Sequence, residues 1–160
     1  MISDKKYLEM TEDEYDTYMC KKYPLIFMDR NKDMSQTCMC WGFDIGPGWR
    51  EMLDKTCENI NFIMEQSHII IIADQVKSKF AGLRFYYHVV NDPHYKEFNP
   101  KWNDIFDLII NEAESRSYHT CEDCGDWGQI RKTGWDYTLC DICFDKLQKE
   151  REKKNAENKT

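Results

Sequence analysis

Residues 68–90 read HIIIIADQVKSKFAGLRFYYHVV, and this stretch sets the expected fold. Residues 68–75 begin with a continuous apolar run, which is typical of a buried strand. Residues 83–90 are rich in β-branched and aromatic side chains, which also favour a strand. Residues 77–82, KSKFAG, separate the two runs and are expected to form a turn. The stretch therefore predicts an antiparallel hairpin.

Helical patterns lie on both sides of this hairpin. A capping box, TEDE, at residues 11–14 predicts a helix over about residues 12–22. The segment GPGW at 46–49 suits the start of a second helix, and apolar residues at helical spacing follow it. A third helix is expected after Asn-Pro at 99–100, again with one apolar face.

The order of these elements predicts an α+β fold, with a small antiparallel sheet packed by helices. The segment CMCWGF at 38–43 is strand-like, and residues 91–98 are expected to form a loop. We interpret residues 1–117 as the α+β domain. Residues 118–160 form the second part, a four-cysteine zinc module with a C-terminal helix.

The zinc module is predicted from CEDCGDWGQIRKTGWDYTLCDIC at residues 121–143. Its two Cys-x-x-Cys pairs supply four thiolates, the donor set that a tetrahedral zinc ion requires. The expected ligands are Cys121, Cys124, Cys140 and Cys143. A knuckle, a hairpin and then a helix with the last two ligands describe a treble-clef or zinc-ribbon-like module. Four cysteines leave no open coordination position, so we expect a structural zinc (Zn²⁺) and not a catalytic one.

Charge limits the partners that this protein can bind. The chain has 22 basic and 29 acidic residues and a formal net charge of −7. Such a surface does not favour broad contact with nucleic acid. Residues 118–143 contain five acidic residues against Arg131 and Lys132, so the zinc module is expected to repel phosphate. Its role is then structural, with a protein-binding surface as a further option.

Two segments are candidates for a ligand site. The first is the acid-free hairpin turn, which is either an anion-binding site or a solvated turn with basic residues. The second is WGFDIGPGW at 41–49, where free N–H groups at a helix start can bind an anion. Its alternative is a glycine turn with tryptophans packed in the core. We expect one electropositive site if both segments lie on the same side. The candidate ligand-binding residues are Lys77, Lys79, Arg84, Trp41, Asp44 and Trp49.

Eight cysteines and the N-terminal sequence bear on the cellular compartment. The first residues, MISDKKYLEMTEDEYD, are too acidic for a signal peptide, and no apolar run reaches the roughly 18 residues of a membrane span. We therefore expect a reducing cytoplasm and no membrane partner. Cys20, Cys38 and Cys40 are either a second metal site or small core residues.

Several motifs resemble a family of small proteins that is common in tailed bacteriophage genomes. They are TEDEYDTYMCKKYPLIFMDR, CMCWGFDIGPGW, DQVKSKFAGLRFYY and the two Cys-x-x-Cys pairs, the first followed by glycine. The resemblance covers nearly the whole chain. The middle motif departs from the family's usual GDGW, because Pro47 replaces the acid. The resemblance implies a phage origin and action in the host cytoplasm.

Two classes of function follow from these observations. The first is a non-enzymatic accessory protein that binds a host or defence protein, or a nucleotide or nucleic acid. The second is an enzyme that acts on a nucleotide or nucleic acid through the Gly-Trp loop and the basic hairpin. The sequence contains no Ser-His-Asp set, phosphate-binding loop or His-Glu-x-x-His motif, which favours the first class.

Overall fold

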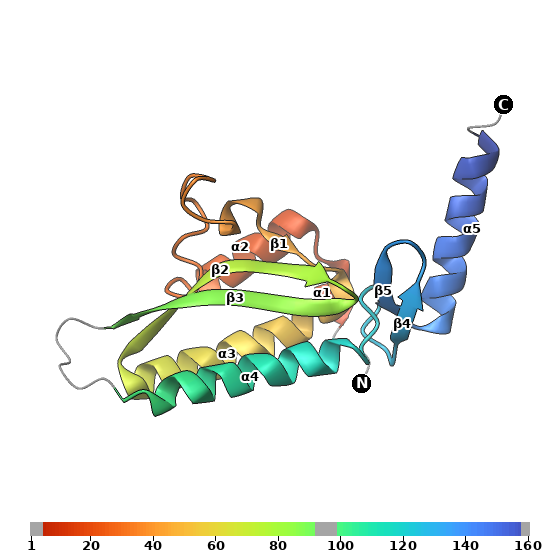
Figure 1. Ribbon diagram of the computed structural model, residues 1–160. Coiled ribbons are helices and arrows are strands. Elements are labelled where there is room, and N and C mark those ends of the chain that lie inside the picture. The colour runs from red at the N-terminus through yellow and green to blue at the C-terminus, as the bar shows by residue number, and fades with distance from the viewer. Residues whose placement is uncertain (1–4, 92–98, 158–160) are drawn as a thin grey trace.

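The structure is a computed structural model that describes residues 5–91 and 99–157. The helices are α1 (Lys5–Glu9), α2 (Glu12–Lys22), α3 (Arg50–Ser67), α4 (Lys101–Ser117) and α5 (Asp141–Glu157), with short 3-10 helices η1 (Met39–Trp41) and η2 (Pro47–Trp49). The strands are β1 (Phe43–Asp44), β2 (Ile69–Lys79), β3 (Gly82–Asn91), β4 (Gln129–Lys132) and β5 (Asp136–Leu139). Figure 1 shows β2 and β3 as the long central hairpin.

The main sheet is mixed, and this corrects the expected antiparallel sheet. β2 and β3 pair antiparallel, as the sequence predicts, but β1 adds to the other edge of β2 in parallel. The reason is the connection between them: α3 crosses back between β1 and β2, so both strands run in the same direction. Of the strand-like segment 38–43, only Phe43 joins the sheet. Gly42, at φ 75°, separates it from η1.

Helices α3 and α4 run side by side along the hairpin (Figure 1). The apolar stripe predicted for α3 is buried, and its largest fully enclosed members are Leu53 and Ile60. α4 also covers the free edge of β3. The N–H of Leu83 donates to Ser117 Oγ at 2.8 Å, and the N–H of Phe85 donates to Glu114 Oε1 at 3.2 Å. Two backbone donors that β3 would otherwise leave unpaired are thus satisfied.

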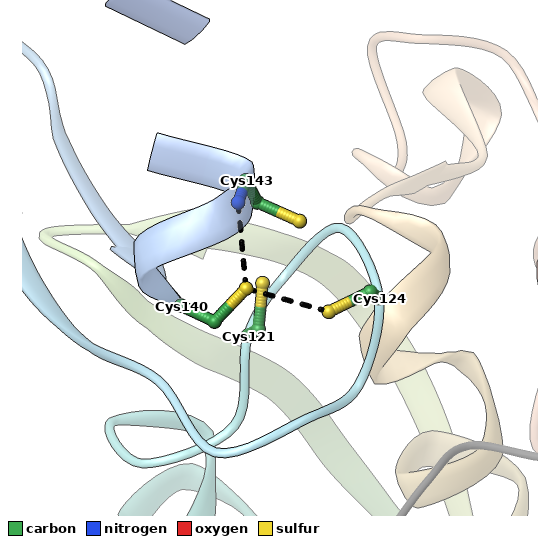
Figure 2. Close-up of side chains that lie close together, drawn as sticks. All are labelled: Cys121, Cys124, Cys140 and Cys143. Carbon is green, nitrogen blue, oxygen red and sulfur yellow. Dashed lines mark hydrogen bonds between the residues drawn. The ribbon is translucent and has the colours of Figure 1, made fainter. Parts of the chain in front are cut away.

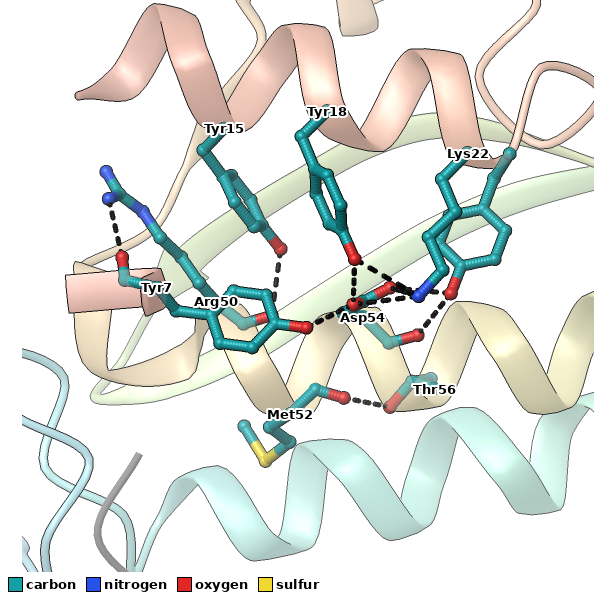
Figure 3. Close-up of polar contacts among 9 residues, drawn as sticks. Tyr7, Tyr15, Tyr18, Lys22, Arg50, Met52, Asp54 and Thr56 are labelled. Atoms are coloured by element: carbon teal, nitrogen blue, oxygen red, sulfur yellow. Dashed lines mark hydrogen bonds and ion pairs between the residues drawn. The ribbon is translucent and has the colours of Figure 1, made fainter. Parts of the chain in front are cut away.

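A buried carboxylate joins the N-terminal helices to α3 (Figure 3). Asp54 accepts hydrogen bonds from Tyr18 Oη at 2.7 Å, Tyr23 Oη at 2.6 Å, Lys22 Nζ at 2.8 Å and the Tyr7 hydroxyl. Burial raises the pKa of Asp54, but the hydrogen bonds from Lys22 and the tyrosines outweigh it and hold this pKa below its ordinary value. Asp54 is therefore an ionised anchor for α1 and α2.

The C-terminal segment lies at one end of the hairpin. β4 and β5 form a second antiparallel pair, and α5 projects from it away from the other helices (Figure 1). Of the loop expected at 91–98, residues 92–98 lie outside the described part of the chain, and Asn91 ends β3. Within the described ranges, no helix combines the length and the apolar composition of a membrane span.

Candidate metal centre

The four cysteines predicted as metal ligands form one cluster (Figure 2). Their Sγ atoms all lie within 4.8 Å of one another, and the Sγ atoms of Cys124 and Cys140 are 3.7 Å apart. A tetrahedral zinc ion with Zn–S bonds of about 2.3 Å requires sulfurs about 3.8 Å apart. The cluster therefore has the donor set and the spacing of a four-thiolate metal site.

Local backbone geometry explains why these two pairs converge. The N–H of Gly125 donates to the Cys121 carbonyl at 2.9 Å, and Gly125 takes the left-handed φ of 78°, which closes the first knuckle. The second pair spans the start of α5, with Cys140 directly before the helix and Cys143 in its first turn, and the N–H of Cys143 donates to Cys140 Sγ at 3.4 Å. Burial opposes the charged form, but this N–H and the neighbouring thiols lower the pKa of Cys140 below its ordinary value. Burial raises the pKa of Cys124 and Cys143, and a bound metal ion would favour the thiolate form of all four cysteines.

The first knuckle docks onto the loop at 46–49. The N–H of Gly48 donates to the Glu122 carbonyl at 2.7 Å, and the indole Nε1 of Trp49 donates to the Thr120 carbonyl at 2.7 Å. A Cβ on Gly48 would overlap the Cys121 carbonyl oxygen and lie 2.8 Å from the Glu122 carbonyl oxygen. The glycines of this loop are required for close contact between two backbones.

This docking changes the interpretation of the Gly-Trp loop as an anion site. Free N–H groups were expected in this loop, but the N–H groups of Gly46 and Gly48 both donate to Glu122. Trp49 is fully buried and cannot contact a ligand at the surface. For this residue, core packing is the correct alternative. Trp41 and Asp44, in contrast, both line a surface cavity.

The turn between β2 and β3 docks onto the same C-terminal segment. Thr138 Oγ1 donates to the Ala81 carbonyl at 2.6 Å, and both residues are buried. A Cβ on Gly82 would lie 2.7 Å from Cζ of Tyr118. Residues 118–143 therefore contact the α+β part at two places, the Gly-Trp loop and the hairpin turn. Sequence reasoning missed Thr138 and Glu122, because no local pattern identifies a residue that contacts a distant part of the chain.

The three basic candidates on the hairpin have different surroundings. Lys77 and Arg84 are opposite each other in the β2–β3 register. The Arg84 guanidinium is already engaged, because Nη2 donates to Tyr118 Oη at 2.6 Å and Nη1 lies 3.8 Å from Glu114. Lys79 lies at the exposed turn, with Nζ 5.1 Å from the ring centroid of Phe80. An anion site formed by all three residues would require Arg84 to leave these partners.

The other cysteine candidates, Cys20, Cys38 and Cys40, do not belong to the cluster of four cysteines. Among the described residues, Cys121, Cys124, Cys140 and Cys143 are the only group that brings metal-ligating atoms together. Cys40 donates from Sγ to the Thr37 carbonyl at 3.2 Å, and Cys38 is exposed. These contacts give no support to a second metal site at the C-x-C sequence.

Comparison of the chain with known protein families, with curated proteins and with solved structures finds no match. The resemblance to a phage family therefore rests on the quoted residues alone. The functional argument has to come from the geometry of the site and of the surface around it.

Proposed function

We propose that Cys121, Cys124, Cys140 and Cys143 hold one zinc ion in a treble-clef-like module. The knuckle, the β4–β5 hairpin and the start of α5 are in the order that such a module requires. Sulfur spacing of 3.7 Å supports a tetrahedral ion bound by thiolates. Because four thiolates complete the coordination, the ion stabilises the fold and leaves no position for a substrate.

We further propose that the protein acts by binding another protein. The main support for this proposal is the conformation and exposure of the turn between β2 and β3. Phe80 and Ala81 have φ of 52° and 62°, a left-handed conformation that non-glycine residues rarely adopt. Phe80 is nevertheless 68% exposed. A strained turn that exposes a phenyl ring is held in place by its surroundings, and such strain is frequent at functional sites.

The zinc module adds to the apolar surface at this turn. Ile130 is the register partner of Thr138, so both side chains lie on the same face of the β4–β5 hairpin. Thr138 points to the turn, since it bonds to the Ala81 carbonyl. Ile130, which is about half exposed, therefore lies beside the turn. We define Phe80 and Ile130 as the tip patch.

A protein partner fits this surface better than a nucleotide does. Exposed aromatic and aliphatic side chains around a rigid turn are the usual anchors of protein interfaces. The enzymatic alternative uses the Gly-Trp loop and the basic hairpin, and in that loop the N–H groups of Gly46 and Gly48 donate to Glu122. The resemblance to phage proteins makes a host or defence protein the expected partner.

The test compares two variants in a pull-down from a bacterial lysate. Phe80→Asp places a charge in the tip patch, and Leu108→Asp makes the same change on α4, where Leu108 is 69% exposed against 68% for Phe80. We expect a protein captured by the wild type to be lost with Phe80→Asp and retained with Leu108→Asp. Equal capture by wild type and Phe80→Asp would contradict the proposal.

A further inference from the structure

A cavity of about 370 Å³ lies between β1, the middle of β2 and the first zinc knuckle. Its charged lining residues are all acidic: Glu12, Asp44 and Glu122. Lys77 is the strand neighbour of Asp44 but is not part of this lining, and its Nζ lies over the Tyr86 ring at 5.8 Å. Trp41 and Asp44, two candidates for an anion site, line this cavity, and its charged residues have the sign that repels an anion.

Glu122 is a buried carboxylate with unused hydrogen-bonding capacity at this cavity. It is 7% exposed, and its Oε2 has no hydrogen-bond partner. Its Oε1 accepts one long bond, from the N–H of Gly46 at 3.4 Å, and Gly46 also lines the cavity. The Ser78 hydroxyl lies beside this carboxylate and can donate one hydrogen bond to it. A carboxylate has about four acceptor sites, so Glu122 keeps hydrogen-bonding capacity for a ligand beyond Gly46 and Ser78.

Trp41 provides an aromatic wall for the same cavity. It ends η1 and is 69% exposed. The next residue, Gly42, has φ 75°, and a Cβ there would lie 3.3 Å from both Arg30 Nη2 and Asp16 Oδ1. An indole face attracts cations, and guanidinium groups stack on it well.

The acidic lining does not favour a metal ion. Among the described residues, only the four cysteines bring three or more metal-ligating atoms close together. Glu12, Asp44 and Glu122 are instead distributed around a cavity large enough for an organic group. Separated carboxylates match the five N–H donors of a guanidinium, which point in several directions from one plane.

We propose that this cavity binds a guanidinium group, stacked on Trp41 and hydrogen-bonded by the surrounding carboxylates. The group belongs either to a free small molecule or to an arginine side chain of a protein. The site does not include the tip patch, so it stands or falls separately from the proposed protein-binding function.

The probe is butylguanidine, with butylurea as a neutral control of the same shape, and binding is measured by titration calorimetry. We expect saturable binding of butylguanidine below about 10 mM and none of butylurea. Trp41→Ala should weaken binding about threefold. Replacing both Glu12 and Asp44 by the amides should weaken it about tenfold. Glu58→Gln, an exposed site on α3 outside the cavity, removes a charge as a matched control and should change nothing.

Three results would overturn the proposal: no saturation with butylguanidine, equal binding of butylurea, or equal weakening by Glu58→Gln. Circular dichroism of each variant verifies that the fold is intact. A blocked Gly-Arg-Gly peptide distinguishes the two sources. Tighter binding of the peptide than of butylguanidine assigns the group to a protein, and weaker binding assigns it to a small molecule.

Discussion

Gly48 illustrates at the scale of one residue how two parts of the chain are joined. Its missing side chain lets the Cys121 and Glu122 carbonyls approach the backbone of the loop at 46–49. From the sequence alone, this loop is a helix start, which the structure confirms. Its second role depends on Glu122, 76 positions away from Gly46, and no local pattern contains that information.

Gly48→Ala should destabilise the protein by about 3 kcal/mol, because the new methyl group overlaps backbone atoms that cannot rotate away. The free energy of unfolding in urea measures this loss. Gly134→Ala is the control. The added Cβ would meet no atom within 4 Å, so this variant loses only the stability that an alanine with a φ of 87° costs. A Gly48→Ala variant as stable as the Gly134→Ala variant would show that the knuckle does not dock as described.

Asp54 connects stability to pH. The pKa of Asp54 is lower in the folded state than in the unfolded chain. Ionised Asp54 therefore stabilises the fold at pH values above the ordinary aspartate pKa, and this stabilisation is lost as the pH falls through the folded pKa. Asp54→Asn should cost about 3 kcal/mol at pH 7, because Lys22 loses its buried partner. The cost should shrink below about pH 4. Urea denaturation of the wild type and of Asp54→Asn between pH 7 and 3 measures this difference in unfolding free energy. A difference that does not change with pH would contradict the assignment of Asp54 as an ionised anchor.

At the scale of elements, the periodicity of the sequence predicts most of the fold. The hairpin, α3 and α4 appear where the apolar patterns indicate them, and α2 follows the capping box that predicts it. β1 was not predicted as a parallel strand, because two residues are too short for any alternating pattern. The turn was predicted over 77–82, but pairing continues to Lys79 and Gly82, which leaves only Phe80 and Ala81. Contacts with the zinc module support this tight turn, and they lie outside the hairpin sequence.

The strained turn gives a prediction in which stability and binding change in opposite directions. Asparagine tolerates the left-handed region better than phenylalanine does. Phe80→Asn should therefore stabilise the protein by about 0.5–1 kcal/mol. The same change should abolish capture of the protein partner, because it removes the ring from the tip patch. The melting temperature measures the first effect, and a lower melting temperature for Phe80→Asn would contradict the assignment of strain to this turn.

On the scale of the whole molecule, the four-cysteine cluster belongs to a C-terminal segment that contacts the α+β part at the Gly-Trp loop and at the hairpin turn. The sequence identified all four cysteines, because ligand spacing is a local property. It did not indicate that Cys121 is buried, or that the knuckle and β5 dock on separate loops of the α+β part. A metal bound by these cysteines would stabilise both this segment and the loops that rest on it.

Native mass spectrometry of protein purified without chelator tests the central claim most directly, that the four cysteines bind one zinc ion. We predict that the folded chain carries the mass of one zinc, and that Cys124→Ser lowers this occupancy strongly. Elemental analysis of the same sample identifies the metal. A folded chain without metal, a chain that carries iron, or full zinc occupancy in Cys124→Ser would contradict the account.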